Sequence, residues 1–203
     1  MKTNKKMLYL IVQSIFSRMI SRKQALELLY THIKNERMIA HSLASEAVMR
    51  GLAKKLGRDE ERWGMAGLLH DLDVEITNAD PAIHGTQTEV LLKGYDLPED
   101  VLDAIRMHNE YSSGKPRDSE FQHALAAGET ITGLIFATTY VYPDKKLASV
   151  KSKSVVKRMK EKAFAASVKR ENILECENIG IPLPEFADLA IRSMLPVAGE
   201  LGL

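Results

Sequence analysis

Apolar residues recur at helical spacing through most of the chain, and polar residues fill the intervening faces. Between residues 21 and 56 this pattern is continuous, and Gly57 follows it as a stop signal. Asp59 then has the character of an N-cap, because the two glutamates after it fall where the helix dipole favours negative charge. The pattern predicts one helical stretch up to residue 56 and a second helix from Asp59 towards His70.

Downstream of His70, helical segments alternate with short polar stretches. Thr86 and Glu89 have the spacing of a capping box, and Pro98 with the acids after it marks the start of a further helix. No convincing alternation of apolar and polar residues indicates a strand, so we predict an all-α fold. The expected loops are 73–81 and 109–119, and the expected helices are one near Thr86, 98–108, 121–140 and two or three within 147–195.

Composition narrows the function classes only slightly. The chain has 203 residues, of which 45% are hydrophobic and 27% charged, as in an ordinary globular protein with one core. We expect a single domain over residues 19–203. The net charge of +1 gives no overall attraction to nucleic acid or to membranes. Because Cys176 is the single cysteine, an internal disulfide is excluded and a cytoplasmic location is expected.

Residues 1–18 differ from the rest. Lysines precede the apolar run 7–12 as in a signal peptide, but Gln13, Ser14 and Arg18 interrupt the pattern and no small-residue cleavage site follows. The run is too short to span a bilayer, so we expect no stable membrane insertion. The segment is interpreted as an extension upstream of Met19 or as a peripheral amphipathic helix, and it could form an interface in a homo-oligomer.

The adjacent pair His70-Asp71 is the strongest candidate for chemistry. An imidazole nitrogen and a carboxylate at one helix end can reach the same divalent metal, and this pair of donors suits hard-to-borderline ions. The preceding residues 64–69 are small or apolar, which places the pair near a core. A carboxylate there is costly unless a positive charge lies beside it.

Further candidates are individually ambiguous. His41 and His108 lie on apolar helix faces, where a hydrogen-bonded core histidine is the simpler interpretation, and His84 could be an ordinary loop residue. Glu129 lies in a helix that is apolar nearly all round. A metal would keep such a buried carboxylate ionised, but Thr130, Thr132 or an arginine could satisfy it instead. His32 and His123 fall outside the pattern.

Together, the order His…His-Asp…His…His…acid resembles the HD superfamily of metal-dependent phosphohydrolases. The resemblance covers about residues 40–140 and is carried by 67–73, by His84-Gly85 and by 126–135. It implies a helical HD-type bundle in which His41, His70, Asp71 and Glu129 hold a first ion. It also implies that Asp71 bridges to a second ion bound by His84 and His108. Glu129 departs from the family pattern, which usually has aspartate, and the HD-GYP variant is not matched.

The resemblance implies one or two divalent ions, with Fe, Mn, Co, Mg, Zn and Ni not distinguished by the donors. We expect hydrolysis of a nucleotide or another small phosphate ester by metal-activated water, with Asp71 as the central catalytic residue. Asp73 is predicted either to act as a general base or an acid behind the ligands, or to end a helix facing solvent. Two alternatives stay open: an HD-type di-iron oxygenase, and a metal- or nucleotide-binding module without turnover.

A phosphate ester also requires positive charge. The segment 144–170 contains ten lysines and arginines against only two acids, Asp144 and Glu161. Most of these cations are expected to be solvated. We predict that one or two reach the substrate, with Lys151, Lys157 and Arg158 as candidates. Nucleic acid is not expected as a partner, because aromatic residues make up only 6% of the chain and do not alternate with the cations of this run, where Phe164 is the single one.

Overall fold

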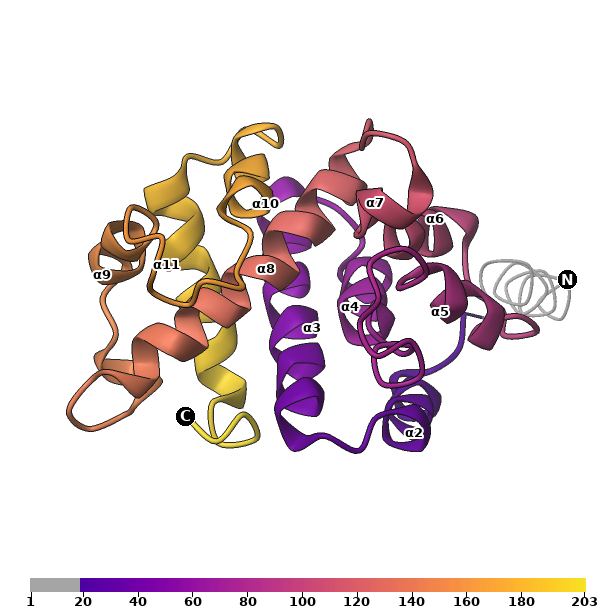
Figure 1. Ribbon diagram of the computed structural model, residues 1–203, viewed down its shortest axis with the longest axis horizontal. Helices are drawn as coiled ribbons and strands as arrows, with labels where there is room; N and C mark the ends of the chain where they lie inside the picture. Colours follow the sequence, from indigo (N-terminus) through magenta and orange to yellow (C-terminus); the bar gives the residue numbers. More distant parts are fainter. Residues whose placement is uncertain (1–18) are drawn as a thin grey trace, which may run out of the picture.

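The computed structural model describes residues 19–203, and within that range the chain forms α-helices and short 3-10 turns but no strand (Figure 1). This confirms the all-α prediction. The predictions for residues 1–18 lie outside the described residues. The helices are α2 (Arg22–His32), α3 (Glu36–Leu56), α4 (Glu60–Leu69), α5 (Thr86–Leu91), α6 (Glu99–Met107), α7 (Glu110–Ser113), α8 (Glu120–Tyr140), α9 (Ser152–Arg158), α10 (Arg170–Leu174) and α11 (Leu183–Met194).

The stretch predicted as continuous up to residue 56 is divided into α2 and α3. Ile33 leaves the helical region, and the side chain of Asn35 caps α3 by accepting from the backbone N–H of Arg37. The carboxylate of Glu75 accepts from the backbone N–H groups of Lys34 and Asn35 at 2.9 and 2.7 Å, which stabilises the break from outside. A long-range contact of this kind has no signal in the local pattern.

The predicted helix starts are partly confirmed. Asp59 accepts from the two N–H groups of the first turn of α4, as an N-cap should, and α6 follows Pro98 directly. The capping box at Thr86 and Glu89 is wrong. Gly85 occupies the cap position with φ of 91°, and the hydroxyl of Thr86 donates to the carbonyl of Ile83 instead.

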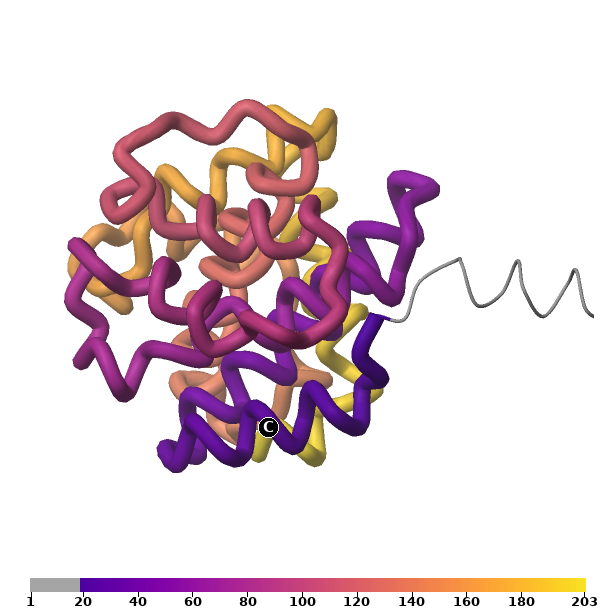
Figure 2. Tube along the Cα trace, turned by 90° about the vertical axis from the view of Figure 1, so that its right-hand side faces the viewer, coloured from indigo at the N-terminus to yellow at the C-terminus, as the bar shows by residue number. Residues whose placement is uncertain are grey.

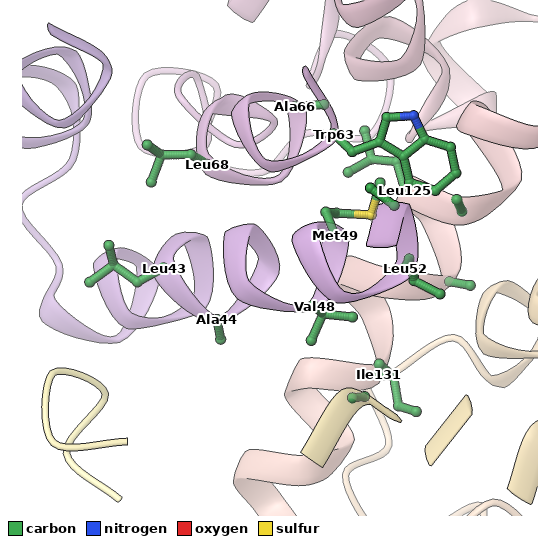
Figure 3. Packing of buried hydrophobic residues seen from close by; sticks show 14 of the residues in the cluster. Leu43, Ala44, Val48, Met49, Leu52, Trp63, Ala66, Leu68, Leu125 and Ile131 are labelled. Carbon is green, nitrogen blue, oxygen red and sulfur yellow. The ribbon is translucent and has the colours of Figure 1, made fainter. Parts of the chain in front are cut away.

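The core is centred on α3, α4 and α8. Met49 of α3 points towards Trp63 of α4 and Leu125 of α8 (Figure 3). Gly67 allows α4 to contact the backbone of α3 directly, since a Cβ there would lie 2.6 Å from the carbonyl oxygen of Ser45. A side chain at this position would separate the two helices, and α4 carries His70 at its end.

Segments distant in sequence close the bundle around α8. The C-terminal helix α11 lies beside α3 in both views (Figures 1 and 2), and α10 packs against α8. This arrangement places the ends of α4 and α6 on one side of α8 and the segment before α10 on another. Among residues 19–203, no helix has the length and apolar character needed to cross a bilayer.

Candidate metal centre

Five separate segments bring the predicted ligands together. His41 lies within α3, and Glu129 lies within α8. His70 and His108 are the C-cap residues of α4 and α6, and His84 lies in the turn that precedes α5. Helix ends serve this purpose because a side chain there projects beyond the packed face of its helix while its backbone stays fixed by the helix.

Asp71 lies at the middle of the cluster. Its Oδ1 is 3.3 Å from Nε2 of His70, 3.1 Å from Nε2 of His84 and 3.4 Å from Nε2 of His108. Its Oδ2 is 3.5 Å from Nε2 of His41. We call His41, His70 and Asp71 the first group, and Asp71, His84 and His108 the second group. In each, the donor atoms are close enough to share one ion, and Asp71 belongs to both.

In each of the four histidines of this cluster, the other ring nitrogen, Nδ1, already has a hydrogen-bond partner. Nδ1 of His70 contacts the carbonyl of Gly67 at 2.9 Å, and Nδ1 of His108 contacts the carbonyl of Ile105 at 2.5 Å. Both carbonyls can only accept, so each Nδ1 carries the proton. Nδ1 of His84 contacts a carboxylate oxygen of Asp73 at 2.7 Å, and Nδ1 of His41 contacts the hydroxyl of Thr132 at 2.8 Å.

That hydroxyl donates to the carbonyl of Glu129, so it accepts from His41. In all four histidines, Nδ1 is thus occupied and Nε2 faces Asp71. Each Nε2 carries a lone pair in the neutral ring, or a proton if the ring is charged. Nε2 of His41 lies 3.2 Å from Nε2 of His70, and Nε2 of His84 lies 3.1 Å from Nε2 of His108. Lone pairs at that separation repel unless a proton or a cation lies between them. This donor set fits a divalent ion.

Electrostatics at the centre follow from burial and crowding. Burial lowers the pKa of His41 and lowers that of His70 to about 3, so both rings stay neutral. For Asp71, burial favours the protonated form, but the surrounding imidazoles outweigh it and hold its pKa well below the usual range. His84 differs, since Asp71 and Asp73 overcome burial and raise its pKa to about 10. A bound cation would displace that proton.

Glu129 lies at the edge of the first group. Its Oε2 is 3.7 Å from Nε2 of His41, and its Oε1 accepts a short hydrogen bond from the hydroxyl of Thr130. Burial raises the pKa of Glu129 to about 8, which the bond from Thr130 only partly opposes. From the sequence, a metal, Thr130, Thr132 or an arginine stayed open as partners of this carboxylate. The structure shows the threonine bond on one oxygen and leaves the other directed at His41.

Asp73 is fully buried, so the interpretation as a solvent-facing helix terminator is wrong. Its Oδ1 binds Nδ1 of His84, and its Oδ2 accepts from the backbone N–H groups of Gly85 and Thr88 at 2.8 and 3.0 Å. Those three contacts occupy both oxygens, and Asp73 does not line the adjoining cavity. Of the two predicted roles, its contacts favour an acid behind the ligands that positions His84 over a general base.

The turn between His84 and α5 depends on two further contacts. Gly85 has φ of 91°, and a Cβ there would lie 3.1 Å from the ring of His108, so a larger residue would be strained and crowded. Asn109 donates from its side chain to the carbonyls of Pro81 and His84 at 2.8 and 2.9 Å. No local sequence pattern indicates that Asn109, directly after His108, holds His84 in place.

Lys151, Lys157 and Arg158 are not brought to the centre. Lys157 is 80% exposed, and Arg158 pairs with Glu161 and lies 4.2 Å over the ring of Phe164. Both line a separate hollow between α9 and the end of α8, and Lys151 lines neither that hollow nor the cavity at the centre. The prediction that one or two cations reach the substrate therefore finds no support at these three candidates, because none of them lines the cavity at the centre.

A cavity of about 690 Å³ adjoins the candidate metal centre. Its walls include His41, Asp71, His84, His108 and Glu129, and also Lys169 and Asn172 from the region of α10. Lys169 belongs to the basic run but was not among the three cations predicted to reach the substrate, and Asn172 was not predicted at all. A five-residue helix with no apolar periodicity gives no signal from which Asn172 could have been found.

The fold and the site together define a class: an α-helical protein with histidines and a shared aspartate converging from separate helices. Comparison with known families identifies it further. Residues 38–160 match the HD domain, which is more than half of the chain, so the chain belongs to the HD domain family. HD domains bind divalent metals, and the family consists in general of metal-dependent phosphohydrolases. The predicted family is thereby confirmed.

Among curated proteins, the chain is similar to Ribonuclease Y of Oleidesulfovibrio alaskensis. The two are 27% identical over 107 residues, which is 53% of this chain but only 20% of that protein. The chain therefore spans about a fifth of the relative's length. No solved structure matches.

Proposed function

We propose that this chain is a metal-dependent phosphohydrolase that hydrolyses a nucleotide or another small phosphate ester through metal-activated water. The observation that supports this most directly is the placement of Asp71 between four imidazole nitrogens at 3.1–3.5 Å. Packing alone does not explain why four histidines surround one carboxylate. Burying these polar groups together is costly unless a cation binds between them.

The residues that would hold the metal are His41, His70 and Asp71 in the first group and Asp71, His84 and His108 in the second, with Glu129 beside the first. A bound divalent ion would lower the pKa of a coordinated water and stabilise negative charge on a phosphoryl oxygen. The protein's own contribution is orientation. Asp73 and Thr132 fix the rings of His84 and His41, and two backbone carbonyls fix those of His70 and His108.

The adjoining cavity suits an organic phosphate better than inorganic phosphate alone. Its volume of about 690 Å³ lies within the range of small-molecule sites. Besides the candidate metal-binding residues, its lining includes the apolar side chains of Met38, Val74, Pro81 and Val168. An ester with its phosphate at the metal-binding residues and an apolar or aromatic part against these side chains would fit it.

A screen of phosphate esters with Mn²⁺, Co²⁺ and Mg²⁺ tests the proposal. We expect metal-dependent release of phosphate by the wild-type protein and its loss in Asp71→Ala. Asp188→Ala serves as a matched control, because Asp188 pairs with Arg192 on the surface of α11. The similarity to a protein named Ribonuclease Y makes a short RNA a useful additional substrate.

Two results would contradict the proposal. One is activity that persists in Asp71→Ala at the wild-type level. The other is a mixed-valent di-iron pair, seen by Mössbauer spectroscopy of anaerobically purified protein, that consumes dioxygen and leaves every phosphate ester intact.

A further inference from the structure

Two hollows meet beside the candidate metal centre. The larger, about 690 Å³, contains the metal-binding residues, and the smaller, about 490 Å³, lies towards α7. Four residues line both hollows and therefore mark their junction: His108 and Asn109 at the end of α6, and Lys169 and Asn172 at the start of α10. The junction thus has one wall from within the matched HD region and one wall from beyond it.

Lys169 is the one lysine or arginine that lines the larger hollow within the described part of the chain. Its ammonium group forms no hydrogen bond or ion pair with any residue of 19–203. By contrast, the guanidinium of Arg117, which lines the smaller hollow, already has protein partners. It pairs with Glu175 and Glu110 and donates to the carbonyl of His108. Lys169 is therefore the cation at the junction that is available to a ligand.

The position of Lys169 is fixed by its neighbour. The guanidinium of Arg170 donates to the carbonyls of Ala165 and Val168 at 2.6 and 2.7 Å, and also to that of Phe164. Val168 in turn contacts α8, because a Cβ on Gly133 would lie 3.3 Å from it. These contacts hold the turn before α10 against α8. The backbone position of Lys169 is therefore fixed by Arg170 and Val168.

Charges on the two sides of Lys169 differ. The larger hollow offers the candidate metal centre, where cations would attract a phosphate. The smaller hollow contains Glu171, a carboxylate that forms no ion pair with the described residues, and also Lys115, so these two side chains together give a phosphate no net attraction. An ester spanning the junction would place its phosphate towards the metal centre and its uncharged, hydroxyl-bearing part towards Glu171 and Tyr111.

Resting on the proposed function, we infer that Lys169 is a specificity-determining residue: its ammonium binds the phosphate of an ester whose organic part crosses from the larger into the smaller hollow. Because residues 38–160 contain the HD match, this contact would belong to the chain's own C-terminal segment and not to the shared domain. Asn172 also lines both hollows, and its side-chain amide donates to the hydroxyl of Thr130 at 3.4 Å.

The test measures binding and turnover separately in Mn²⁺-loaded protein. Calorimetry with inorganic phosphate and with AMP gives affinity, and hydrolysis of p-nitrophenyl phosphate gives kcat and KM. We expect Lys169→Ala to weaken phosphate and AMP binding and to raise KM by about fivefold to tenfold, with kcat and metal content nearly unchanged. Lys169→Arg should restore most of the affinity, and high salt should reduce the difference. Lys162→Ala, in the same segment but lining neither hollow, is the matched control.

The outcomes separate this inference from the proposed function. Wild-type turnover with unchanged affinity and KM in Lys169→Ala would overturn the inference and leave the function standing. Phosphate binding that depends on Lys169, without hydrolysis of any ester, would support the inference and count against the function. A wild-type protein that binds neither phosphate nor AMP would overturn the inference. Equal losses in Lys162→Ala would also overturn it, because they would show a general charge effect.

Discussion

The two groups that share Asp71 are alike in their donors and different in what stands behind them. In the first group, His41 is oriented by the neutral hydroxyl of Thr132, and a partly protonated Glu129 lies nearby. In the second group, His84 is oriented by the buried carboxylate of Asp73. The second group therefore has more negative charge per donor. We expect it to hold the tighter ion, since a carboxylate behind an imidazole raises the basicity of the ligand.

Removing the shared ligand should have the largest effect. Asp71→Ala takes one donor from each group and removes the carboxylate that the four histidines share, so we expect metal affinity to fall more than about 100-fold at both groups. Metal content after dialysis, by plasma mass spectrometry, measures this directly. Retention of one ion at wild-type affinity would show that Asp71 does not bridge the groups. Circular dichroism distinguishes loss of metal from loss of fold.

The residues behind the histidines should separate the two groups. Asp73→Asn removes the charge behind His84, and we expect the second group to lose about 10- to 100-fold in affinity while the first is unchanged. Thr132→Val removes a neutral partner of His41, so the first group should lose less than about tenfold. Titration of metal-free protein with Mn²⁺ resolves the two steps. Equal losses in both variants would erase the distinction between the groups.

The pH dependence of binding should also differ. Asp71 and Asp73 raise the pKa of His84 to about 10, so at neutral pH its ring holds a proton that a metal must displace. Affinity at the second group should therefore fall as pH falls, by up to about tenfold per unit. The pKa values of His41 and His70 are lowered by burial, so these rings add no such slope between pH 6 and 9. Calorimetry in buffers of different ionisation enthalpy counts the released protons, and a flat second step would contradict this.

The smallest effect is expected at Glu129. Its pKa is raised to about 8 by burial, so at pH 7 it is mostly protonated before metal binds, and glutamine resembles that form. Glu129→Gln should weaken the first group by only about two- to threefold at pH 7 and by more at pH 9, where the wild-type carboxyl is ionised. A loss at pH 7 as large as that in Asp71→Ala would show that Glu129 is a principal ligand. Glu129→Asp, which keeps the charge, is the matched comparison.

Sequence alone anticipated the convergence of the histidines with Asp71 because the family pattern spans the positions that carry them. It could not give the direction of Asp73. Asp73 lies on a turn two residues past Asp71, where a side chain could face either solvent or the core. It faces the core because the backbone N–H groups of Gly85 and Thr88 donate to it there. Helical periodicity likewise says nothing about Glu75, whose contacts with Lys34 and Asn35 accompany the division between α2 and α3.

The lysines and arginines of 144–170 show more clearly that long-range contacts cannot be predicted from the local sequence. Charge density in 144–170 indicated an anionic ligand, but which lysine reaches the cavity depends on how the turn before α10 is tied down. Arg170 fixes this turn, and the hydrogen bonds of its guanidinium all go to backbone carbonyls. Backbone acceptors have no sequence signature, so the selection of Lys151, Lys157 and Arg158 over Lys169 could not have been corrected from the chain alone.

The stacked aromatic pair between α4 and α8 gives this protein an intrinsic fluorescent reporter. Trp63 is the single tryptophan of the chain, and its ring lies parallel to that of Phe121 at 4.9 Å, with an interplanar angle of 4°. It shares α4 with the turn that ends at His70, and it is packed against α8, which carries Glu129. Its fluorescence therefore reports on one interface only, and titration of metal into the protein can be followed by emission without an attached dye.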